Sequence, residues 1–559
     1  MTRLKNNRCA DSSGMIAEML KYGGTELAKI LCNMFNAILN GDDQPPEAWK
    51  KTILTVLFKS GDSRAAKNYR PIAIIPTLYK LFARLLFGRL SPILDSQQCP
   101  DQAGFRADYS TVDHFFTIAQ LHEKSNEFQL NLWTAAIDFQ KAFDSIEHDG
   151  IWHALGSQGV PHHYIWLLRR LYSDQAGVVR SDVMSKQFSI TRGVKQGDPL
   201  SSLLFNSLLE HIMRAVKPQW VTKRFGMQTS VGQDTRLMNL RFADDLFLIG
   251  KTQKQISTML EDVIRAARTY GLELHPEKTK ILTNVSKQNG RPVKKSLEVD
   301  GINIEVLAID AAIKYLGRMI SFSDFQGVEI QNRMRATWDK FMCYKQELTN
   351  KNLSLNSRLR LFDGVVSPTL LYGSEAWALT KGHETLLQRT QRRMLRMILA
   401  PGRRIVTHTV QSATTGSSED SAEELSTNDV HELEEPEMLE PWADWVRRVT
   451  HQIEEQMNRL QIKSWVCQAR ARKWKYAGRV ASHAPDRWTH RLLHWDPEVS
   501  FDGRYSGPRR RQARPKTRWA DELEKFCARE RAQGWHEIAA SPADWKLLEQ
   551  KFCSDDWRA

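Results

Sequence analysis

Cysteine is scarce and scattered in this chain of 559 residues. The seven cysteines include no Cys-x-x-Cys pair and no short Cys/His cluster, which argues against a disulfide scaffold and against a zinc knuckle. We therefore expect reduced, buried thiols of the kind found in intracellular proteins.

Long apolar runs are also missing. The first eight residues lack the apolar core of a secretory signal, and no stretch approaches the ~18–20 apolar residues that a membrane-spanning helix needs. These absences predict a soluble, intracellular protein of the nucleus and/or cytoplasm that has no membrane partner.

Positive charge is abundant instead. Lys and Arg number 79 against 65 Asp and Glu, a formal net charge of +14, and 41% of the residues are hydrophobic. The length exceeds the usual domain of about 100–200 residues several times, so several domains with sizeable cores are expected. The excess of basic residues fits a protein that binds a polyanion, although a merely soluble basic protein has the same balance.

Two adjacent carboxylates, Asp244 and Asp245, lie between apolar runs in the sequence LRFADDLFLI at 240–249. Charge is unfavourable in such a place unless a cation binds there, and the expected cation is Mg²⁺. Because alternate residues of a strand face opposite ways, the pattern predicts a short β-hairpin with this pair at its tip. The alternative is an exposed Asp-Asp turn between two core strands.

A second strand-end acid stands about a hundred residues upstream. In IDFQKAFD at 137–144, Asp138 follows an apolar run rich in strand formers. Carboxylates from separate strands that hold two divalent ions about 3.5–4 Å apart are a common apparatus for in-line phosphoryl transfer.

The order of Asp138 and then Asp244-Asp245 resembles motifs A and C of the reverse transcriptase palm. Five further segments resemble other motifs of this family in its order: NYRPIAII (68–75) and QAGFR (102–106) from the fingers, RGVKQGDPLS (192–201) as motif B, GLELHPEKTK (271–280) as motif D, and KYLG (314–317) as motif E. Together they form a specific signal. Their forms are most similar to non-LTR, LINE-type retrotransposons, and 368–377 and 507–519 also resemble those elements; a group II intron maturase fits less well.

The resemblance implies an α+β right-hand polymerase fold, with fingers, a palm built on an antiparallel sheet, and a helical thumb, followed by a mainly helical basic C-terminal region. The expected boundaries are 1–130 for an N-terminal extension and fingers, 131–320 for the palm, 321–410 for the thumb, 411–441 for an acidic disordered linker, and 442–559 for a Trp/Arg-rich nucleic-acid-binding region. The linker prediction rests on ten acids and no Lys or Arg between 416 and 440.

The implied activity is RNA-directed DNA polymerisation, with two Mg²⁺ ions, or Mn²⁺ as a substitute, as cofactors. Asp138, Asp244 and Asp245 are the expected catalytic acids. They would bind the metal together with the backbone carbonyl of Phe139, and Asp245 would either ligate or only shape the hairpin. Six residues are expected at the incoming nucleotide. They are Lys59 and Arg70 at the triphosphate, Phe143 beneath the sugar, Gln196 and Gly197 in the motif B loop, and Lys278 as proton donor to pyrophosphate. The alternatives are that Phe143 is a core residue and that Lys278 is a solvated lysine.

Basic residues later in the chain are expected to hold nucleic acid. They are Arg389, Arg392, Arg393 and Arg396 in the thumb and Arg509, Arg510, Arg511, Arg514, Lys516 and Arg518 near the C-terminus. A solvated helix face is the alternative for the first group, and a nuclear import signal for the second. Ten of the 17 tryptophans fall between 442 and 557, and either base stacking or core packing explains them.

The expected partners are an RNA template, a DNA primer or nicked target, and dNTPs. The sequence leaves no room for an N-terminal nuclease, so a separate nuclease or a missing domain would have to nick the target; the oligomeric state is not predicted. The rival hypothesis is a catalytically idle descendant that only binds nucleic acid. It draws on the departure of residues 9–14 from the glycine-led opening motif of the family and on the acidic insert.

Overall fold

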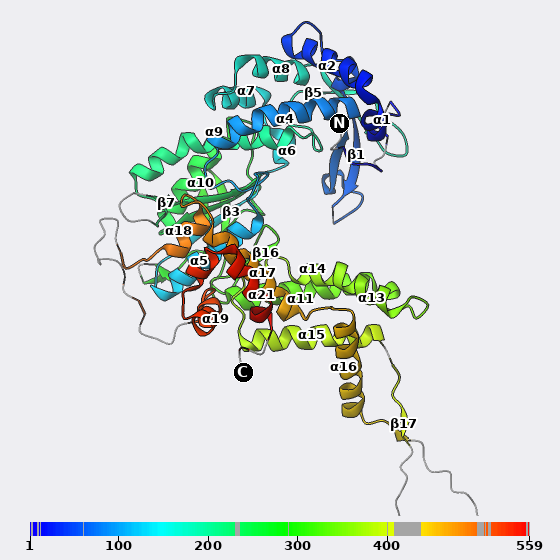
Figure 1. Ribbon diagram of the computed structural model, residues 1–559. Helices are drawn as coiled ribbons and strands as arrows, with labels where there is room; N and C mark the ends of the chain where they lie inside the picture. Colours follow the sequence, from blue (N-terminus) through cyan, green and yellow to red (C-terminus); the bar gives the residue numbers. More distant parts are fainter. Residues whose placement is uncertain are drawn as a thin grey trace, which may run out of the picture. The chain divides into compact units, whose positions relative to one another are not determined.

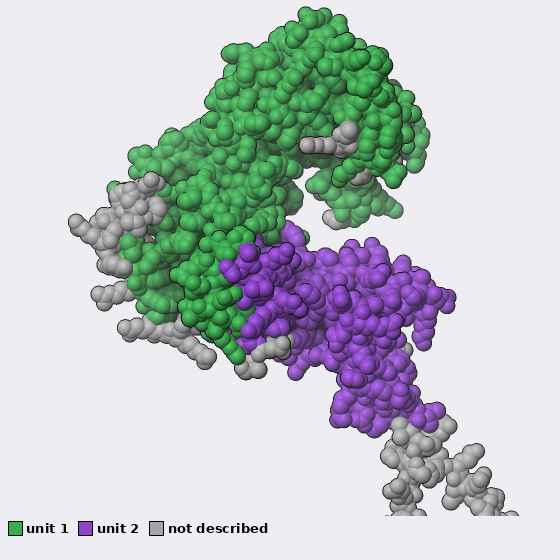
Figure 2. Space-filling model, in the orientation of Figure 1, with its two compact units in different colours: residues 1–329, 477–542 green, residues 330–476, 543–559 purple. Residues whose placement is uncertain are grey.

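Two compact units make up the chain in the computed structural model (Figure 2). The structure describes residues 1, 4–7, 10, 11, 13–59, 61–229, 235–288, 290–399, 401–406, 438–499, 508, 510, 511, 516–554 and 557. Unit 1 consists of residues 1–329 and 477–542, and unit 2 of residues 330–476 and 543–559. Unit 1 therefore contains a C-terminal segment that returns to it after the chain has entered unit 2.

The centre of unit 1 is a six-stranded mixed sheet with the order β13-β14-β10-β3-β9-β8. Its strands are β13 (Ser296–Val299), β14 (Ile302–Val306), β10 (Lys280–Thr283), β3 (Trp133–Ile137), β9 (Asp245–Gly250) and β8 (Asn239–Phe242). The central strand β3 is buried along its whole length and runs antiparallel to both β9 and β10. Alternate side chains of these strands enter two different cores, so both faces of the sheet are covered.

Helices cover the two faces (Figure 1). Ala135, Ile137 and Leu248 pack in one core with α9 (Ser201–Thr222) and α10 (Gln253–Arg268). Ala136 and Phe247 point to the opposite core, which contains α5 (Thr111–Glu127) and, from the C-terminal segment, α18 (Trp488–His494). The core on this face of the sheet is therefore complete only with the C-terminal segment in place.

A second sheet of unit 1 has the order β2-β1-β4-β5. Its first two strands are β1 (Lys51–Phe58) and β2 (Tyr69–Ile74), paired antiparallel from Ile53↔Ile74 to Phe58↔Tyr69. The sheet is completed by β4 (Gln175–Arg180), parallel to β1, and β5 (Phe188–Ile190).

The remaining elements of unit 1 are mostly helices. Before the second sheet lie α1 (Ala17–Tyr22), α2 (Gly24–Asn40) and α3 (Glu47–Lys50), where helical periodicity is present in the sequence. The other helices are α4 (Thr77–Gln97), α6 (Ala142–Ser145), α7 (His148–Ser157), α8 (His162–Tyr172), α19 (Asp521–Arg531) and α20 (Trp535–Ala539). Three two-stranded sheets join β6 (Met227–Gln228) to β7 (Arg236–Leu237), β11 (Lys287–Gln288) to β12 (Arg291–Pro292), and β15 (Ile313–Tyr315) to β16 (Arg318–Ile320).

Unit 2 is mainly helical. Its helices are α11 (Phe325–Cys343), α12 (Lys345–Thr349), α13 (Leu355–Leu361), α14 (Ser367–Leu370), α15 (Lys381–Leu399), α16 (Trp442–Arg459), α17 (Trp465–Ala481) and α21 (Pro542–Cys553). Three of them, α11, α17 and α21, begin or end in unit 1. A short two-stranded pair joins β17 (Ile405–Val406) to β18 (Met438–Leu439). Trp474 stacks on Trp545 with ring centroids 3.6 Å apart. Both rings are buried, as are Trp488, Trp495 and Trp519 of unit 1, so core packing is the role that the structure gives these tryptophans.

The mixed sheets and helices confirm the predicted α+β class. Six cysteines in the described ranges are free thiols. The expectation that the thiols are buried is wrong for Cys32 and Cys343, which are exposed, because each lies on a solvent-facing side of a helix. Among the described helices none is both long and apolar enough to cross a membrane. Most of the predicted acidic linker lies outside the described residues.

Candidate active site

The two predicted acidic motifs meet at one end of the central sheet. Asp138 directly follows β3, and β3 pairs with β9 so that Ile137 lies opposite Leu246. β8 and β9 form the predicted hairpin, and its register pairs Phe242 with Asp245. Ala243 and Asp244 are therefore the two turn residues, and Asp245 is the first residue of β9. The predicted turn at the acidic pair is confirmed, one position earlier than expected.

Asp138 and Asp244 line the same cavity of about 1130 Å³. The cavity is also lined by all six predicted nucleotide-site residues (Lys59, Arg70, Phe143, Gln196, Gly197 and Lys278) and by Phe139. Asp245 is absent from the lining, and its charge instead contributes to raising the pKa of the buried Tyr315 hydroxyl, for which burial is the larger cause. Of the site residues predicted in motifs A and C, the structure thus brings all but Asp245 to this cavity.

The three acids repel one another. Burial, and then the neighbouring charges of Asp244 and Asp138, raise the pKa of Asp245 to about 7. The pKa of Asp244 is also raised, first by burial and then by Asp138. Carboxylates placed so close that their charges disfavour one another are stabilised by a bound cation, and their hard oxygen atoms suit Mg²⁺.

Backbone hydrogen bonds fix Asp138 against the motif D loop. The Asp138 carbonyl accepts from the amide of His275 at 2.8 Å, and the Asp138 amide donates to Thr279 Oγ1 at 3.3 Å. Lys278 Nζ lies 3.3 Å from Asp138 Oδ1 and forms an ion pair with it. Within the ranges that the structure describes, no three His, Cys, Asp or Glu side chains gather closely enough to hold a metal ion by themselves. A cation at Asp138 and Asp244 would therefore need ligands from elsewhere.

Cationic side chains line the same cavity as these acids. The pKa of Lys59 is lowered, first by burial and then by the nearby charges of Arg70 and Lys278, while Asp144 and Asp138 oppose that change. Lys59 and Arg70 are carried by the β1–β2 hairpin, whose end is closed by the Lys59 amide donating to the Asn68 carbonyl at 2.9 Å. Cations that disfavour one another in this way mark a place where an anion with several charges binds well.

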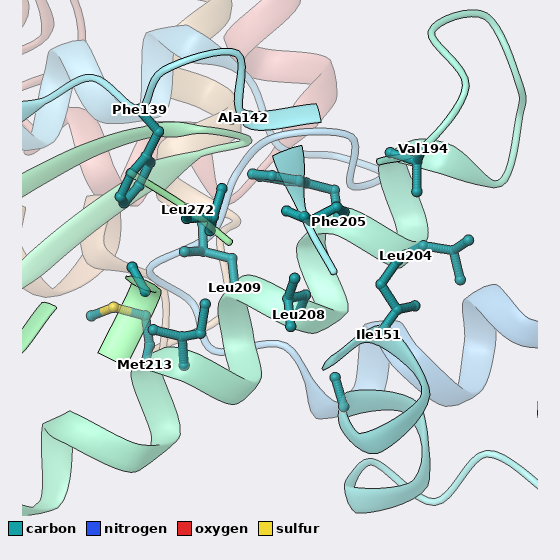
Figure 3. Close-up of a cluster of buried hydrophobic side chains, with 14 of the residues drawn as sticks. Phe139, Ala142, Ile151, Val194, Leu204, Phe205, Leu208, Leu209, Met213 and Leu272 are labelled. Carbon is teal, nitrogen blue, oxygen red and sulfur yellow. The ribbon is translucent and has the colours of Figure 1, made fainter. Parts of the chain in front are cut away.

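The wall beside the acids is aromatic. Phe143 stacks on the buried Phe205 of α9, with ring centroids 4.5 Å apart and planes at 20°. Figure 3 shows Phe205 beside Leu208 and Leu209 in the core, near Phe139 and Ala142. On the cavity side Phe105 approaches Phe143 edge-on at 6.5 Å, and Phe105 itself is exposed. Phe143 is thus neither a fully buried core residue nor a free one.

The motif B loop lies against the segment that carries Phe143. The amides of Gly193 and Val194 donate to the carbonyls of Ile146 and Phe143, each at 2.7 Å. The Gln196 side-chain amide donates to Asp144 Oδ1 at 3.1 Å. Gly197 has φ +116°, a backbone conformation that favours glycine, and faces the Ala73 carbonyl.

Candidate nucleic-acid residues of the thumb lie on α15. Arg389, Arg392 and Arg393 are exposed and Arg396 is partly buried. Two of them already have protein partners, since Arg392 Nη2 lies 2.8 Å from Glu454 Oε1 and Arg396 donates to Thr450 Oγ1 at 3.3 Å. The Arg393 guanidinium lies over the Trp338 ring.

The C-terminal basic residues are only partly described. Arg509 and Arg514 lie outside the described residues. Arg510 pairs with Glu127, and the Arg511 amide donates to the Glu127 carbonyl at 2.9 Å. Arg518 Nε lies 2.9 Å from Asp521 Oδ1, whereas Lys516 is exposed. Acidic side chains of unit 1 therefore already neutralise part of this charge.

The sequence analysis missed several residues that line the cavity. Arg84 of α4 lines the cavity together with Phe105 and Asp144. No local pattern marks Arg84. Phe105 and Asp144 lie inside quoted motifs, so motif membership was the available signal for them.

Comparison with known proteins agrees with this site. Residues 57–320 match the family of reverse transcriptases (RNA-dependent DNA polymerases). This range contains the central sheet, the acids, the second sheet apart from residues 51–56 of β1, and the cavity lining apart from Thr52, Leu54 and Val56. Residues 57–320 are therefore a reverse transcriptase domain.

The similar proteins come from mobile elements. A retrovirus-related Pol polyprotein from the type-1 retrotransposable element R2 of Popillia japonica is 26% identical over 363 residues, covering 63% of this chain and 49% of that protein. A probable RNA-directed DNA polymerase from transposon X-element of Drosophila melanogaster is 25% identical over 415 residues, covering 71% and 43%. The chain carries a reverse transcriptase domain similar to those of these retrotransposon proteins, and it spans half or less of the length of these two relatives.

Among solved structures, the telomerase of Candida albicans in complex with a fragment of telomeric RNA is similar at 13% identity. The match covers 67% of this chain and 69% of that one, with a TM-score of 0.38.

Proposed function

We propose that this chain is an RNA-directed DNA polymerase that adds dNTPs to the 3′-hydroxyl of a primer paired with an RNA template. The observation that carries the proposal is that Asp138, at the end of β3, and Asp244, in the β8–β9 turn, line one cavity together with Lys59, Arg70 and Lys278. Acidic and basic side chains that line the same cavity suit a triphosphate with divalent cations.

Asp138 and Asp244 are the residues that would hold the metal ions, with the Phe139 carbonyl beside them. When bound, two Mg²⁺ ions would activate the primer hydroxyl and neutralise the phosphates during in-line displacement. Phosphate oxygens of the substrate would supply the remaining ligands, because among the described residues no three His, Cys, Asp or Glu side chains gather closely enough to hold a metal ion. Asp245, outside the cavity lining, adds negative charge that favours the cations without direct ligation.

The basic residues orient the triphosphate. Arg70 and Lys59 lie on the β1–β2 hairpin, line the same cavity as the acids and bind the phosphates. Lys278 is paired with Asp138 in the free protein. Lys278 is the group that would donate a proton to the departing pyrophosphate. Phe143 lies beneath the sugar and excludes a 2′-hydroxyl, while Gln196 and Gly197 contact the nucleotide from the motif B loop.

Polymerase activity is tested by primer extension on poly(rA)/oligo(dT) with Mg²⁺ and labelled dTTP. The wild-type chain is expected to incorporate dTMP, and Asp138→Ala and Asp244→Asn are expected to abolish incorporation while the duplex still binds. Lys254→Ala, on the exposed side of α10, is the control and should leave extension unchanged. Salt-sensitive duplex binding without any incorporation by the wild type would favour the catalytically idle descendant.

A further inference from the structure

The hairpin that carries Asp244 does not end the central sheet with a bare edge. Residues 101–103 run alongside β8, the last strand in the sheet order. The Arg241 amide donates to the Asp101 carbonyl at 2.7 Å, and the Ala103 amide donates to the Arg241 carbonyl at 2.9 Å. An unpaired edge strand would leave these groups unsatisfied, so residues 101–103 hold β8 in place.

The same segment holds the turn itself. Ala243, the residue before Asp244, has φ +55°, a left-handed conformation that costs a non-glycine residue roughly 1 kcal/mol or more. Its amide donates to Gln102 Oε1 at 3.0 Å, and the Gly104 amide donates to the same oxygen at 2.8 Å. Gln102 is fully buried. The strained turn is therefore fixed by one buried side chain.

Beneath this segment lies a buried layer of charges. Asp101 Oδ2 lies 2.6 Å from Lys217 Nζ, and Arg241 Nη2 lies 2.7 Å from Glu210 Oε2. Asp101, Glu210 and Arg241 are all buried. Buried ion pairs require accurate geometry to offset the loss of hydration, so removal of one partner disturbs the others.

One partner of this layer comes from the C-terminal segment. Trp488 at the start of α18 donates from Nε1 to Asp101 Oδ1 at 2.7 Å, across 387 positions of the sequence. The Trp488 ring is buried in the core under the sheet together with Leu492 and Trp495. With Lys217, Trp488 thus occupies both carboxylate oxygens of Asp101, whose backbone carbonyl pairs with β8.

We propose that Trp488 is a positioning residue for the catalytic hairpin, which it orients through Asp101 and the paired strand β8. The C-terminal segment then has a role in the polymerase core itself, separate from contact with nucleic acid. The predicted effect of Trp488 on catalysis rests on the proposed function. The predicted effect of Trp488 on the structure of the hairpin does not depend on activity.

The test uses Trp488→Phe in the full chain, which keeps an aromatic ring in the core and removes the Nε1 donor together with part of the ring volume. Trp495→Phe is the matched control, because Trp495 packs in the same core without the contact to Asp101. Gln102→Met is the second test variant, which removes the acceptor of the Ala243 amide. Three quantities are measured for each: hydrogen exchange of the peptide 239–247, the kcat and Mg²⁺ dependence of primer extension, and the Kd for the primer–template duplex.

Trp488→Phe and Gln102→Met are expected to speed exchange in peptide 239–247 and to lower kcat, each by about tenfold, the usual weight of one charge-assisted or buried hydrogen bond. The Mg²⁺ concentration for half activity should rise, whereas the duplex Kd should not change. Trp495→Phe should leave all three as in the wild type.

Equal effects of Trp488→Phe and Trp495→Phe would overturn the proposal, since a general loss of core packing would then explain both. A change in duplex Kd alone would assign Trp488 to nucleic-acid binding and would overturn it too. If the wild type does not extend primers, the proposed function fails, but the exchange of peptide 239–247 still decides whether Trp488 positions the hairpin.

Discussion

The Gln196 side-chain amide donates to the Asp144 carboxylate at 3.1 Å, and this bond joins the two loops that flank the candidate nucleotide site. Asp144 lies directly after Phe143, so one bond couples the residue proposed under the sugar to the motif B loop. Burial raises the pKa of Asp144, and the bond from Gln196 opposes that rise. The carboxylate therefore stabilises one orientation of the Gln196 amide.

Asp144→Ala should weaken nucleotide binding. Without its acceptor the Gln196 amide rotates freely, so the KM for dTTP is expected to rise about tenfold, the weight of one hydrogen bond to a charged group, with a smaller change in kcat. Asp144→Asn retains an acceptor oxygen and should restore most of the loss. Steady-state primer extension at varied dTTP measures both parameters, and a fall in kcat at constant KM would contradict this role.

Phe143→Ala should relax the choice between deoxyribo- and ribonucleotides. If the ring excludes a 2′-hydroxyl, its removal should raise the relative kcat/KM for rUTP by roughly 10- to 100-fold, as steric discrimination at a pocket wall allows. Single-nucleotide insertion with dTTP and with rUTP gives the ratio. Phe105→Ala, which removes the exposed ring edge-on to Phe143, is the control and should leave the ratio unchanged.

Gly104→Ala should abolish extension. An added Cβ at Gly104 would lie 2.3 Å from the Ala243 amide nitrogen in the catalytic turn, so the turn would have to move. Gly88→Ala is the matched control: it lies in α4, has no atom within 4 Å of the new Cβ, and should stabilise the helix by about 1 kcal/mol. Extension assays and thermal unfolding of both variants make the comparison. Normal extension by the first variant would show that the turn tolerates displacement.

Unit 1 should lose stability as the pH falls below neutrality. Burial lowers the pKa of His114 and of His122 to about 3, from the ordinary 6.5. The unfolded chain therefore binds more protons below pH 6.5, and each histidine removes up to about 1.4 kcal/mol of stability for every pH unit between 6.5 and 3.

His122→Phe tests this pH dependence, because His122 stacks on Phe325 with ring centroids 4.6 Å apart and an aromatic ring keeps that contact. Denaturant unfolding at pH 7.5, 6.5 and 5.5 should give a smaller loss of stability for the variant than for the wild type. His451→Phe, on α16 of unit 2, is the control and should retain the wild-type slope. Equal slopes for all three proteins would contradict the prediction.

Arg393→Ala should reduce the salt dependence of duplex binding. If its guanidinium contacts a phosphate, the slope of log Kd against log salt should fall by about 1, with uniform weakening across sequences. Arg392→Ala should change the slope less, because Arg392 is already paired with Glu454. Fluorescence anisotropy with a labelled primer–template duplex at several salt concentrations measures the slope. Identical slopes for wild type and Arg393→Ala would remove this residue from the interface.

The catalytic hairpin and the end of β3 could be predicted from the sequence because both depend on local patterns: an apolar run, a carboxylate and a tight turn. The position of Asp245 outside the cavity also follows from strand alternation, but only once the register of β9 is fixed. The burial of Trp474 and Trp488 could not be predicted, since composition alone does not separate a core ring from a stacking ring. Nor could the pairing of Arg510 with Glu127, which joins residues hundreds of positions apart.

The path of the chain also has a consequence for synthesis on the ribosome. The segment 477–542 completes unit 1, but it is made after most of unit 2, so Trp488, one of the partners of Asp101, does not exist until nearly the whole chain has been translated. Domains generally fold as units while the chain emerges at about 5–20 residues per second. Here unit 1 cannot be completed until residues 477–542 have been synthesised. A nascent or prematurely terminated chain therefore contains Asp138 and Asp244 before it contains Trp488, which orients the catalytic hairpin. We expect full polymerase activity only after the C-terminal segment has been made.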